Sequence, residues 1–321
     1  MESLPQADNQ HMTIPVETKL EPEPTLEEMM ALTPVNYAIV IPCRNEEKLI
    51  SDCLDAALNQ SIPPSVILVV DDSSTDFTPN ILEKWSIQDP RVVPIRINYK
   101  RYKNRGYNVS GATRKAYEEL FKMELNFDYI MNLDSDTIIP YNYVETLIGE
   151  MERNPSLAIC SGIADWRKQP IISNNHATNA ARLYRASFSK EEMPYPIINA
   201  HDTYMEYRAI YMGWEVKTLP LIFKDQRRFK RSLIRWFLSG QFRYRNGLTI
   251  RHAFLSALQS LRQTPYIVGS LVGLFSFLVH CLTDSRLKDR DYIEHMQKFN
   301  DRDIIDYFKG RFRRMFFGHI K

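Results

Sequence analysis

Two clusters of carboxylates are the residues in this sequence whose types and spacing most clearly suggest chemistry. The segment DSD (134–136) ends one apolar run, and the segment DDSSTD (71–76) ends another. Two carboxylates held close together repel each other unless a cation lies between them. A divalent metal with oxygen ligands meets that need, and it can also bridge the oxygens of a diphosphate.

Each cluster also has a plainer interpretation. Asp and Ser are common turn residues, so the segment 134–136 alone is typical of a solvated turn. The segment 71–76 is typical of N-cap residues that open a helix. An EF-hand loop is not expected, because Ile138 and Ile139 occupy positions where ligands and the turn glycine are required. The elements around the clusters must decide between these interpretations.

The apolar pattern predicts strands that alternate with helices. Strands are expected at 35–42, 65–72, 91–97, 127–136 and 157–163, and helices at 46–60, from about 75 to 85, at 111–123 and at 141–150. Continuous apolar strands alternating with helices indicate a parallel sheet covered on both faces. Ligands of such sheets bind beyond the carboxyl ends of the strands, and both carboxylate clusters lie at such ends.

Three motifs in this order resemble the start of the inverting family 2 glycosyltransferases of the GT-A fold. They are AIVIPCRNEEKLISDCL (38–54), VILVVDDSSTDFTPNIL (66–82) and the D-x-D at 134–136. The family pattern reads VIPxYNEE, VDDGSxDxT and then a metal-binding D-x-D. This sequence departs from it at Arg44, where an aromatic residue is common, and at Ser73, where Gly is common. The resemblance covers roughly residues 36–240 and implies an α/β, GT-A-type, Rossmann-like fold with a mostly parallel sheet flanked by helices.

The resemblance also implies roles for individual residues on the donor side. Pro42, Arg44 and Glu46 would line the nucleotide pocket, Asp72, together with Asp71, would contact the base or ribose, and Asp134 and Asp136 would hold Mn²⁺ or Mg²⁺ on the donor diphosphate. The chemistry agrees with this arrangement. Departure of a nucleoside diphosphate builds up negative charge, and a metal ion at its oxygens stabilises that charge as a Lewis acid.

A glycosyltransferase of this kind also needs a carboxylate that takes the proton from the acceptor hydroxyl. In the family this is usually the Asp of a Glu-Asp pair that opens a helix. The matching segment here is NAHDTYMEYRAIYMGWEVKTLP (199–220), in which Gly213-Trp214 resemble the family's stop before a short strand. The resemblance therefore implies Asp202 as the general base, with His201 in place of the acid. A plain helix cap remains the alternative for Asp202.

Several basic residues are candidates for binding the diphosphate. Arg114 opens a predicted helix, Arg235 precedes Trp236, and two further clusters lie at 100–105 and 227–231. Arg235-Trp236 resembles the end of the QxxRW motif of processive synthases, but Ser232 replaces Gln, so processivity is not inferred. Each basic cluster is also typical of a solvated face.

The charge is distributed unevenly along the chain. The total of 41 Lys and Arg against 39 Asp and Glu gives a net charge of +2. Residues 1–34 carry −6, residues 35–223 carry −4 and residues 224–321 carry +12. We expect a mobile acidic arm at 1–34 with one helical turn at 26–32, a GT-A catalytic domain at 35–240 and a helical, basic region at 241–321. A composition of 44% hydrophobic and 25% charged residues excludes a mostly disordered or polytopic membrane protein.

Four isolated cysteines and the N-terminal sequence indicate a cytoplasmic protein. Cys43, Cys53, Cys160 and Cys281 have no metal-ligand spacing and are expected to be reduced, buried thiols. The N-terminal sequence lacks a basic start followed by an apolar run, so no signal peptide is expected.

The basic C-terminal region suggests contact with a membrane surface. Residues 263–283 contain no charged side chain, but a single crossing would export the ten Lys and Arg of 284–321. A helix that packs on the domain or dips into one leaflet is therefore favoured over a span. Residues 304–321 resemble an interfacial helix. A soluble helical appendage or an oligomer contact remains the alternative. No motif for binding nucleic acid is recognised, so no nucleic-acid partner is expected.

These observations predict metal-dependent, inverting transfer of a sugar from a nucleotide-diphosphate sugar to a glycan or polyprenyl-linked acceptor. A nucleotidyltransferase is the nearest enzymatic alternative, although PCRNEE (42–47) has none of the glycines of a phosphate loop. A non-catalytic protein that binds sugar nucleotides is the alternative from another class.

Overall fold

The computed structural model describes residues 35–98, 102, 105–123, 125–165, 176–227, 232–261, 266–283 and 290–299. The chain divides into two units, Met1–Val35 and Asn36–Lys321, and the described strands and helices all belong to the second. The helical turn expected at 26–32 and the interfacial helix expected at 304–321 lie outside the described residues.

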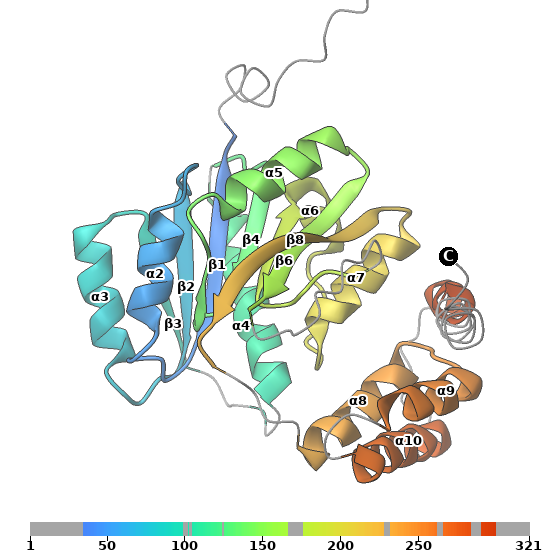
Figure 1. The fold of residues 1–321 in the computed structure, drawn as a ribbon. Coiled ribbons are helices and arrows are strands. Elements are labelled where there is room, and N and C mark those ends of the chain that lie inside the picture. Colours follow the sequence, from blue (N-terminus) through green and yellow to red (C-terminus); the bar gives the residue numbers. More distant parts are fainter. Residues whose placement is uncertain are drawn as a thin grey trace, which may run out of the picture. The chain divides into compact units, whose positions relative to one another are not determined.

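The described residues contain a mixed sheet of eight strands in the order β3-β2-β1-β4-β7-β6-β8-β5 (Figure 1). The strands are β1 (Tyr37–Cys43), β2 (Val66–Asp72), β3 (Val92–Ile97), β4 (Tyr129–Leu133), β5 (Thr137–Ile138), β6 (Leu157–Ala164), β7 (Ala181–Arg185) and β8 (Glu215–Asp225). Strands β3, β2, β1 and β4 run parallel, as do β6 and β8. Strand β7 is antiparallel to both β4 and β6, and β5 is antiparallel to β8.

Residues 290–299 are helical, and nine further helices are described. They are α2 (Ile50–Leu58), α3 (Thr78–Gln88), α4 (Arg105–Leu120), α5 (Tyr143–Arg153), α6 (Ala186–Glu192), α7 (His201–Tyr211), α8 (Leu233–Arg245), α9 (Ile250–Ser260) and α10 (Tyr266–Thr283). The crossovers from β1 to β4 pass through α2, α3 and α4, as parallel strands require. The prediction of an α/β fold with a mostly parallel sheet is confirmed.

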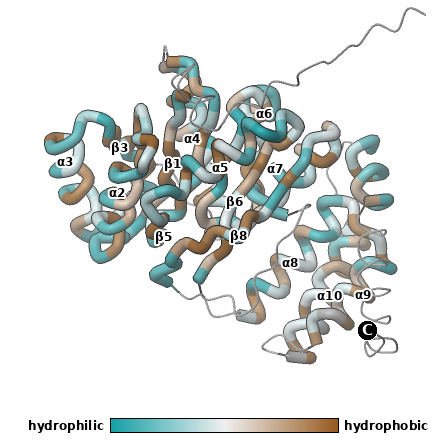
Figure 2. The backbone as a smooth tube through the Cα atoms, turned by 45° about the horizontal axis from the view of Figure 1, so that its top comes forward, coloured by the Kyte–Doolittle hydropathy of each residue, from teal (hydrophilic) through white to brown (hydrophobic). Residues whose placement is uncertain are grey.

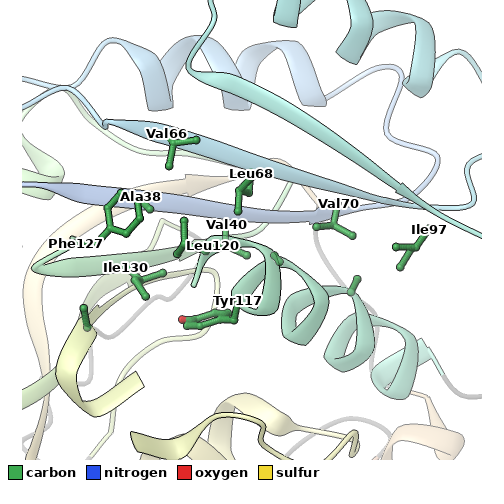
Figure 3. Close-up of a cluster of buried hydrophobic side chains, with 13 residues drawn as sticks. Ala38, Val40, Val66, Leu68, Val70, Ile97, Tyr117, Leu120, Phe127 and Ile130 are labelled. Carbon is green, nitrogen blue, oxygen red and sulfur yellow. The ribbon is translucent and has the colours of Figure 1, made fainter. Parts of the chain in front are cut away.

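The centre of the parallel half is dry, which explains its uninterrupted apolar sequence. Every residue of β2 is buried, and β1 is buried apart from the partly exposed Pro42. Helix α4 packs one face of this half: Figure 3 shows Tyr117 and Leu120 against Val40, Leu68 and Ile130. Because both faces of β1 and β2 are covered, their side chains show no alternation of polar and apolar residues.

Several boundaries differ from the sequence prediction, and two elements were not predicted. Helix α2 begins at Ile50 rather than 46, because the amides of Leu49 and Ile50 both bond to the carbonyl of Glu46 in a turn. Helix α4 begins at Arg105, six residues before the predicted start. Strand β7 and helix α6 fall in the stretch 164–200, for which the sequence predicts neither a strand nor a helix. Strand β7 is short and largely buried, so it lacks an alternating pattern.

Helices α8 and α10 pack closely through small residues, and α9 also packs on α10. A Cβ added at Gly240 of α8 would lie 2.1 Å from the carbonyl oxygen of Gly273 in α10, so glycine is needed for this close approach. Helix α8 also reaches α4, where Arg245 donates a hydrogen bond to the hydroxyl of Tyr107 at 2.5 Å. Figure 2 shows hydrophobic residues along α9 and α10. Among the described helices, none combines the length and the apolar character needed to cross a membrane.

Candidate active site

Two adjoining cavities lie at the carboxyl ends of β1, β2 and β4. The first has a volume of about 470 Å³, and we call it the Arg44 cavity; its lining includes Pro42, Arg44, Glu46, Asp72, Asn108, Ser135 and Arg227. The second has a volume of about 660 Å³, and we call it the Asp202 cavity; its lining includes Pro42, Asp134, Ser135, Asp136, His201, Asp202 and Arg235. The two share Pro42, Val109 and Ser135, so they form neighbouring parts of one site.

The loops that follow β1 and β2 are tied together around the Arg44 cavity. The Arg44 guanidinium donates hydrogen bonds to the carbonyls of Asp72 and Ser73, at 2.6 and 2.8 Å. Asn45 and Ser73 have left-handed φ angles of 52° and 55°, which non-glycine residues adopt at a cost. The Ser73 hydroxyl donates to the carbonyl of Ile97 at 2.7 Å. Position 73 therefore needs a left-handed backbone, which glycine adopts without cost. This explains the glycine of the family pattern at the position that Ser73 occupies here.

Of the three carboxylates in segment 71–76, two make local hydrogen bonds and one lines the Arg44 cavity. Asp71 is buried and accepts a hydrogen bond from the amide of Ser74 at 2.9 Å, with Arg96 3.7 Å away. Asp76 accepts hydrogen bonds from the amides of Thr78 and Glu47. Both carboxylates therefore act in local turns and at a helix start. Asp72 alone of the three lines the Arg44 cavity.

Arg227, to which the sequence assigned no individual role, contacts both Glu46 and Asp136. Arg227 donates a hydrogen bond through Nη2 to Oε2 of Glu46, and its Nε lies 3.6 Å from Oδ2 of Asp136. Burial by itself lowers the pKa of Arg227, but the hydrogen bond and charge of Glu46 raise it by more. In the sequence Arg227 is only one member of a basic cluster. No spacing relates it to Glu46, which lies 181 residues earlier.

Asp134 and Asp136 lie at the turn between β4 and β5. The amide of Asp134 bonds to the carbonyl of Ala180 at 2.8 Å, and the amide of Thr137 closes the turn on the carbonyl of Asp134 at 3.0 Å. Among the described residues, no cluster of three or more His, Cys, Asp and Glu side chains is arranged to hold a metal ion. Two carboxylates two residues apart are nonetheless a donor set that fits Mg²⁺ or Mn²⁺, which accept phosphate and water oxygens as their other ligands.

Asp202 lies in the first turn of α7, facing the same cavity as Asp134 and Asp136. The helix starts sharply, because Ala200 takes a left-handed conformation with φ 58° and ψ 45°. Strained backbone at a non-glycine residue is typical of functional sites. Ala200 also lines the Asp202 cavity, so the strain lies where it directs the start of α7 toward that cavity.

A buried ion pair holds this first turn in place. Arg182 of β7 and Glu206 of α7 are almost fully buried and lie 2.5 Å apart. Arg182 also donates a hydrogen bond to the carbonyl of Asp202 at 2.7 Å, and Glu206 accepts another from the amide of Ala177 at 2.9 Å. Burial lowers the pKa of Arg182, but the charge of Glu206 more than offsets this and raises it. Neither residue was recognised from the sequence.

His201 is a buried aromatic partner. Its ring stacks on Tyr195, with centroids 5.7 Å apart and planes at 10°. Burial lowers the pKa of His201, against the opposing effect of the Asp202 charge. A neutral imidazole therefore occupies the position where the family usually has an acid.

The two arginines proposed for the diphosphate differ in position. Arg235 lines the Asp202 cavity near the start of α8. Arg114 lines neither cavity; it pairs with Glu118 at 2.8 Å and donates to the carbonyl of Tyr195 at 3.4 Å. In the basic clusters, the side chains at 100, 101, 103, 105 and 228–231 lie outside the described ones.

The four cysteines are all free, and three of them are buried. Cys43 lines the Arg44 cavity, and the Cys53 thiol lies 3.5 Å from the carbonyl of Asp134. Burial, reinforced by the nearby carboxylates, raises the pKa of both thiols. Neither thiol is therefore suited to act as a nucleophile at neutral pH.

Comparisons with known proteins agree with this arrangement. Residues 38–211 match the family model described as Glycosyl transferase family 2. The succinoglycan biosynthesis protein ExoA of Rhizobium meliloti (strain 1021) is 33% identical over 283 residues, which cover 77% of this chain and 81% of that protein. Chondroitin synthase of Escherichia coli is 33% identical over 121 residues, which cover 38% of this chain but only 16% of that protein.

Among solved structures, the mannosyltransferase PcManGT from Pyrobaculum calidifontis in complex with GDP-Man and Mn²⁺ has a similar fold. The TM-score is 0.52 at 14% identity, over 81% of this chain and 78% of that one. The sheet and the position of the cavities thus define a glycosyltransferase fold of the GT-A type. The chain belongs to glycosyl transferase family 2, which confirms the resemblance found in the sequence.

Proposed function

We propose that this protein is a metal-dependent, inverting glycosyltransferase that transfers a sugar from a nucleotide-diphosphate sugar to a hydroxyl group of a glycan or polyprenyl-linked acceptor. One observation carries the proposal. Asp202 of α7 lines one cavity with Asp134 and Asp136 from the turn after β4, and this cavity adjoins the Arg44 cavity. Family membership supports the reaction class.

The nucleotide is assigned to the Arg44 cavity and the transferred sugar to the Asp202 cavity. Pro42, Arg44, Glu46 and Asp72 surround the first, with Asp71 behind them in the loop. Arg235 is placed to neutralise the diphosphate from the second cavity. The contacts of Arg114 favour a positioning role for it, at the backbone of Tyr195. That PcManGT was solved with GDP-Man and Mn²⁺ supports a nucleotide sugar as the donor.

In the proposed reaction Asp202 accepts the proton of the acceptor hydroxyl as its oxygen attacks the anomeric carbon. Attack from the face opposite the diphosphate breaks the bond to the leaving oxygen and inverts the configuration. The leaving diphosphate takes the electron pair and gains negative charge. A divalent cation on Asp134 and Asp136, when bound, would stabilise that charge as a Lewis acid. Arg235 adds a fixed positive charge on the same side.

A thermal-shift screen tests the donor and the metal together. We expect at least one of the UDP-, GDP-, CDP- and dTDP-sugars to raise Tm in the presence of Mn²⁺ and to have little effect without it. A ligand at 100 times its Kd stabilises by about 2.7 kcal/mol. Asp136→Asn should abolish most of the Mn²⁺-dependent part of the shift.

The matched control for this screen is Asp52→Asn, which removes an exposed carboxylate from the first turn of α2. It should leave the shift unchanged. If none of these sugar nucleotides stabilised the protein in a Mn²⁺-dependent way, the proposed donor chemistry would be wrong.

The proposed C-terminal region (241–321) is assigned to peripheral contact with the cytoplasmic face of a membrane. Helix α8 runs across the proposed boundary at 240. Exposed hydrophobic side chains lie on α9 and α10, among them Ile250, Phe254, Leu258, Ile267, Leu271, Phe275 and Leu282. Residues 226–283 contain nine Lys and Arg and no Asp or Glu. Apolar side chains combined with charge of one sign fit an anionic lipid surface better than a second copy of the same positive face.

Vesicle binding tests this surface. Ile267, Leu271 and Phe275 lie four residues apart on α10 and are 59%, 58% and 62% exposed. Leu271→Ser with Phe275→Ser should weaken binding to vesicles containing anionic lipid by roughly 100-fold, because each removes apolar area that the bilayer would bury. Added salt should weaken binding of the unaltered protein as well.

The control for the vesicle experiment is Phe77→Ser with Ile87→Ser, two residues near α3 that are 70% and 78% exposed. This variant should bind as the unaltered protein does. If the protein instead self-associated through Leu271 and Phe275 and did not bind vesicles, the membrane proposal would be wrong. These residues would then form a contact with a second copy of the chain.

A further inference from the structure

Arg227 connects two acids that belong to different parts of the site. Glu46 follows β1, Asp136 lies between β4 and β5, and Arg227 follows β8. Glu46 and Asp136 are only 3% and 5% exposed, whereas the Arg227 side chain is 34% exposed. A single guanidinium thus bridges two buried carboxylates from the more open side of the Arg44 cavity.

This bridge has an electrostatic reason. Two buried carboxylates without a cation are unfavourable, since each loses its hydration and they repel each other. Arg227 supplies positive charge to both, at hydrogen-bond distance from Glu46 and 3.6 Å from Asp136. Asp136 is also one of the two residues proposed to hold the divalent cation. A guanidinium and a divalent cation on the same carboxylate repel, so the two compete for Asp136.

We propose that Arg227 is an exchangeable counter-cation. Without donor it neutralises Glu46 and Asp136; when the metal and the donor bind, it leaves Asp136 and pairs with the donor diphosphate. The guanidinium matches phosphate oxygens in a two-pronged geometry and remains charged at every physiological pH. Its position in the lining of the Arg44 cavity puts it beside the proposed nucleotide pocket. This inference rests on the proposed function.

The exchange has a thermodynamic consequence. Arg227 lowers the affinity of the metal when no nucleotide is present, because the metal must displace it from Asp136. A diphosphate that accepts Arg227 removes this penalty, and by linkage the metal then strengthens binding of the diphosphate by the same factor. Arg227 therefore couples the two ligands and discourages binding of the metal alone.

The coupling can be measured without any assay of transfer. Calorimetric titration of Mn²⁺, alone and then with UDP, GDP, CDP or dTDP, gives the two affinities for the unaltered protein and for Arg227→Gln. In the variant we expect Mn²⁺ alone to bind about tenfold more tightly, because its competitor is gone. We expect the nucleoside diphosphate to bind about tenfold more weakly in the presence of Mn²⁺. The factor by which each ligand strengthens the other should fall, leaving only the part that direct contact between the metal and the diphosphate supplies.

Two further variants complete the test. Arg91→Gln removes a partly exposed arginine paired with Asp89 at the opposite end of β3, and it should leave both affinities unchanged. Should Arg227→Gln fail to fold because the ion pair with Glu46 is lost, the double variant Glu46→Gln with Arg227→Gln removes both charges. This double variant should also bind Mn²⁺ alone more tightly.

The outcomes separate the inference from the function on which it rests. Unchanged or weaker Mn²⁺ binding by the variants, beside an unaltered protein that binds Mn²⁺ and a nucleotide cooperatively, would make Arg227 a static brace and overturn the exchange. An unaltered protein that binds neither ligand would overturn the proposed function itself.

Discussion

Asp202→Asn is expected to lower kcat for sugar transfer by about 10³-fold, within the range that general bases contribute. Asparagine has nearly the shape of aspartate but cannot accept the proton of the acceptor hydroxyl. The carbonyl of Asp202 would still accept its hydrogen bond from Arg182, so the first turn of α7 should keep its position. The measurement is steady-state transfer from the donor identified in the thermal-shift screen.

The donor provides an internal control for this variant. Asp202 lies outside the lining of the Arg44 cavity, so the Mn²⁺-dependent thermal shift should persist in Asp202→Asn. Asp52→Asn should transfer sugar at the normal rate. Undiminished transfer by Asp202→Asn would remove this residue from the mechanism. Donor binding without transfer by the unaltered protein, tested with candidate acceptors, would favour a non-catalytic sugar-nucleotide binding protein.

The second large effect is expected on stability. Glu206→Gln should lower the free energy of unfolding by about 3–5 kcal/mol, because it leaves the Arg182 charge buried without its counter-ion. Glutamine keeps the size of the side chain and can still accept hydrogen bonds, so the loss reports the charge. For a chain of this length the corresponding decrease in Tm is on the order of 10 °C. Chemical denaturation and thermal unfolding both measure it.

A surface pair gives the matched comparison for Glu206→Gln. Glu150 pairs with Lys217 at 2.5 Å and is 20% exposed, against 2% for Glu206. Glu150→Gln should cost less than about 1 kcal/mol, because solvent screens such pairs. If Glu206→Gln cost no more than Glu150→Gln, the interaction between Arg182 and Glu206 would contribute little to stability.

The local sequence was sufficient to predict the parallel half of the sheet and its ligand-binding edge. Strands β1 and β2 are buried on both faces, so their residues form continuous apolar runs that are visible without any alignment. The carboxylates at 71–72 and 134–136 follow such runs, and strand direction then brings them to one edge. The roles assigned to Asp72, Asp134, Asp136 and Asp202 remain predictions, which substitutions at these positions test.

The antiparallel insertion was harder to recognise, for a physical reason. Strand β7 takes its place between β4 and β6 through pairing with strands 48 to 56 residues and 21 to 25 residues away in sequence. Its own five residues, ARLYR, include an arginine that would ordinarily count against a buried strand. Arg182 is buried there only because Glu206, on a later helix, neutralises it.

The sequence by itself determined the family, the order of the strands and helices around the ligand edge, and the carboxylates that face it, because these depend on short-range pattern and motif. Only the tertiary structure decided which cation meets which acid. It joined Arg227 to Glu46 and Asp136, buried Arg182 beside Glu206, and turned Arg114 toward the backbone of Tyr195. Charge pairing acts through space between residues far apart in the chain, so no local pattern records it.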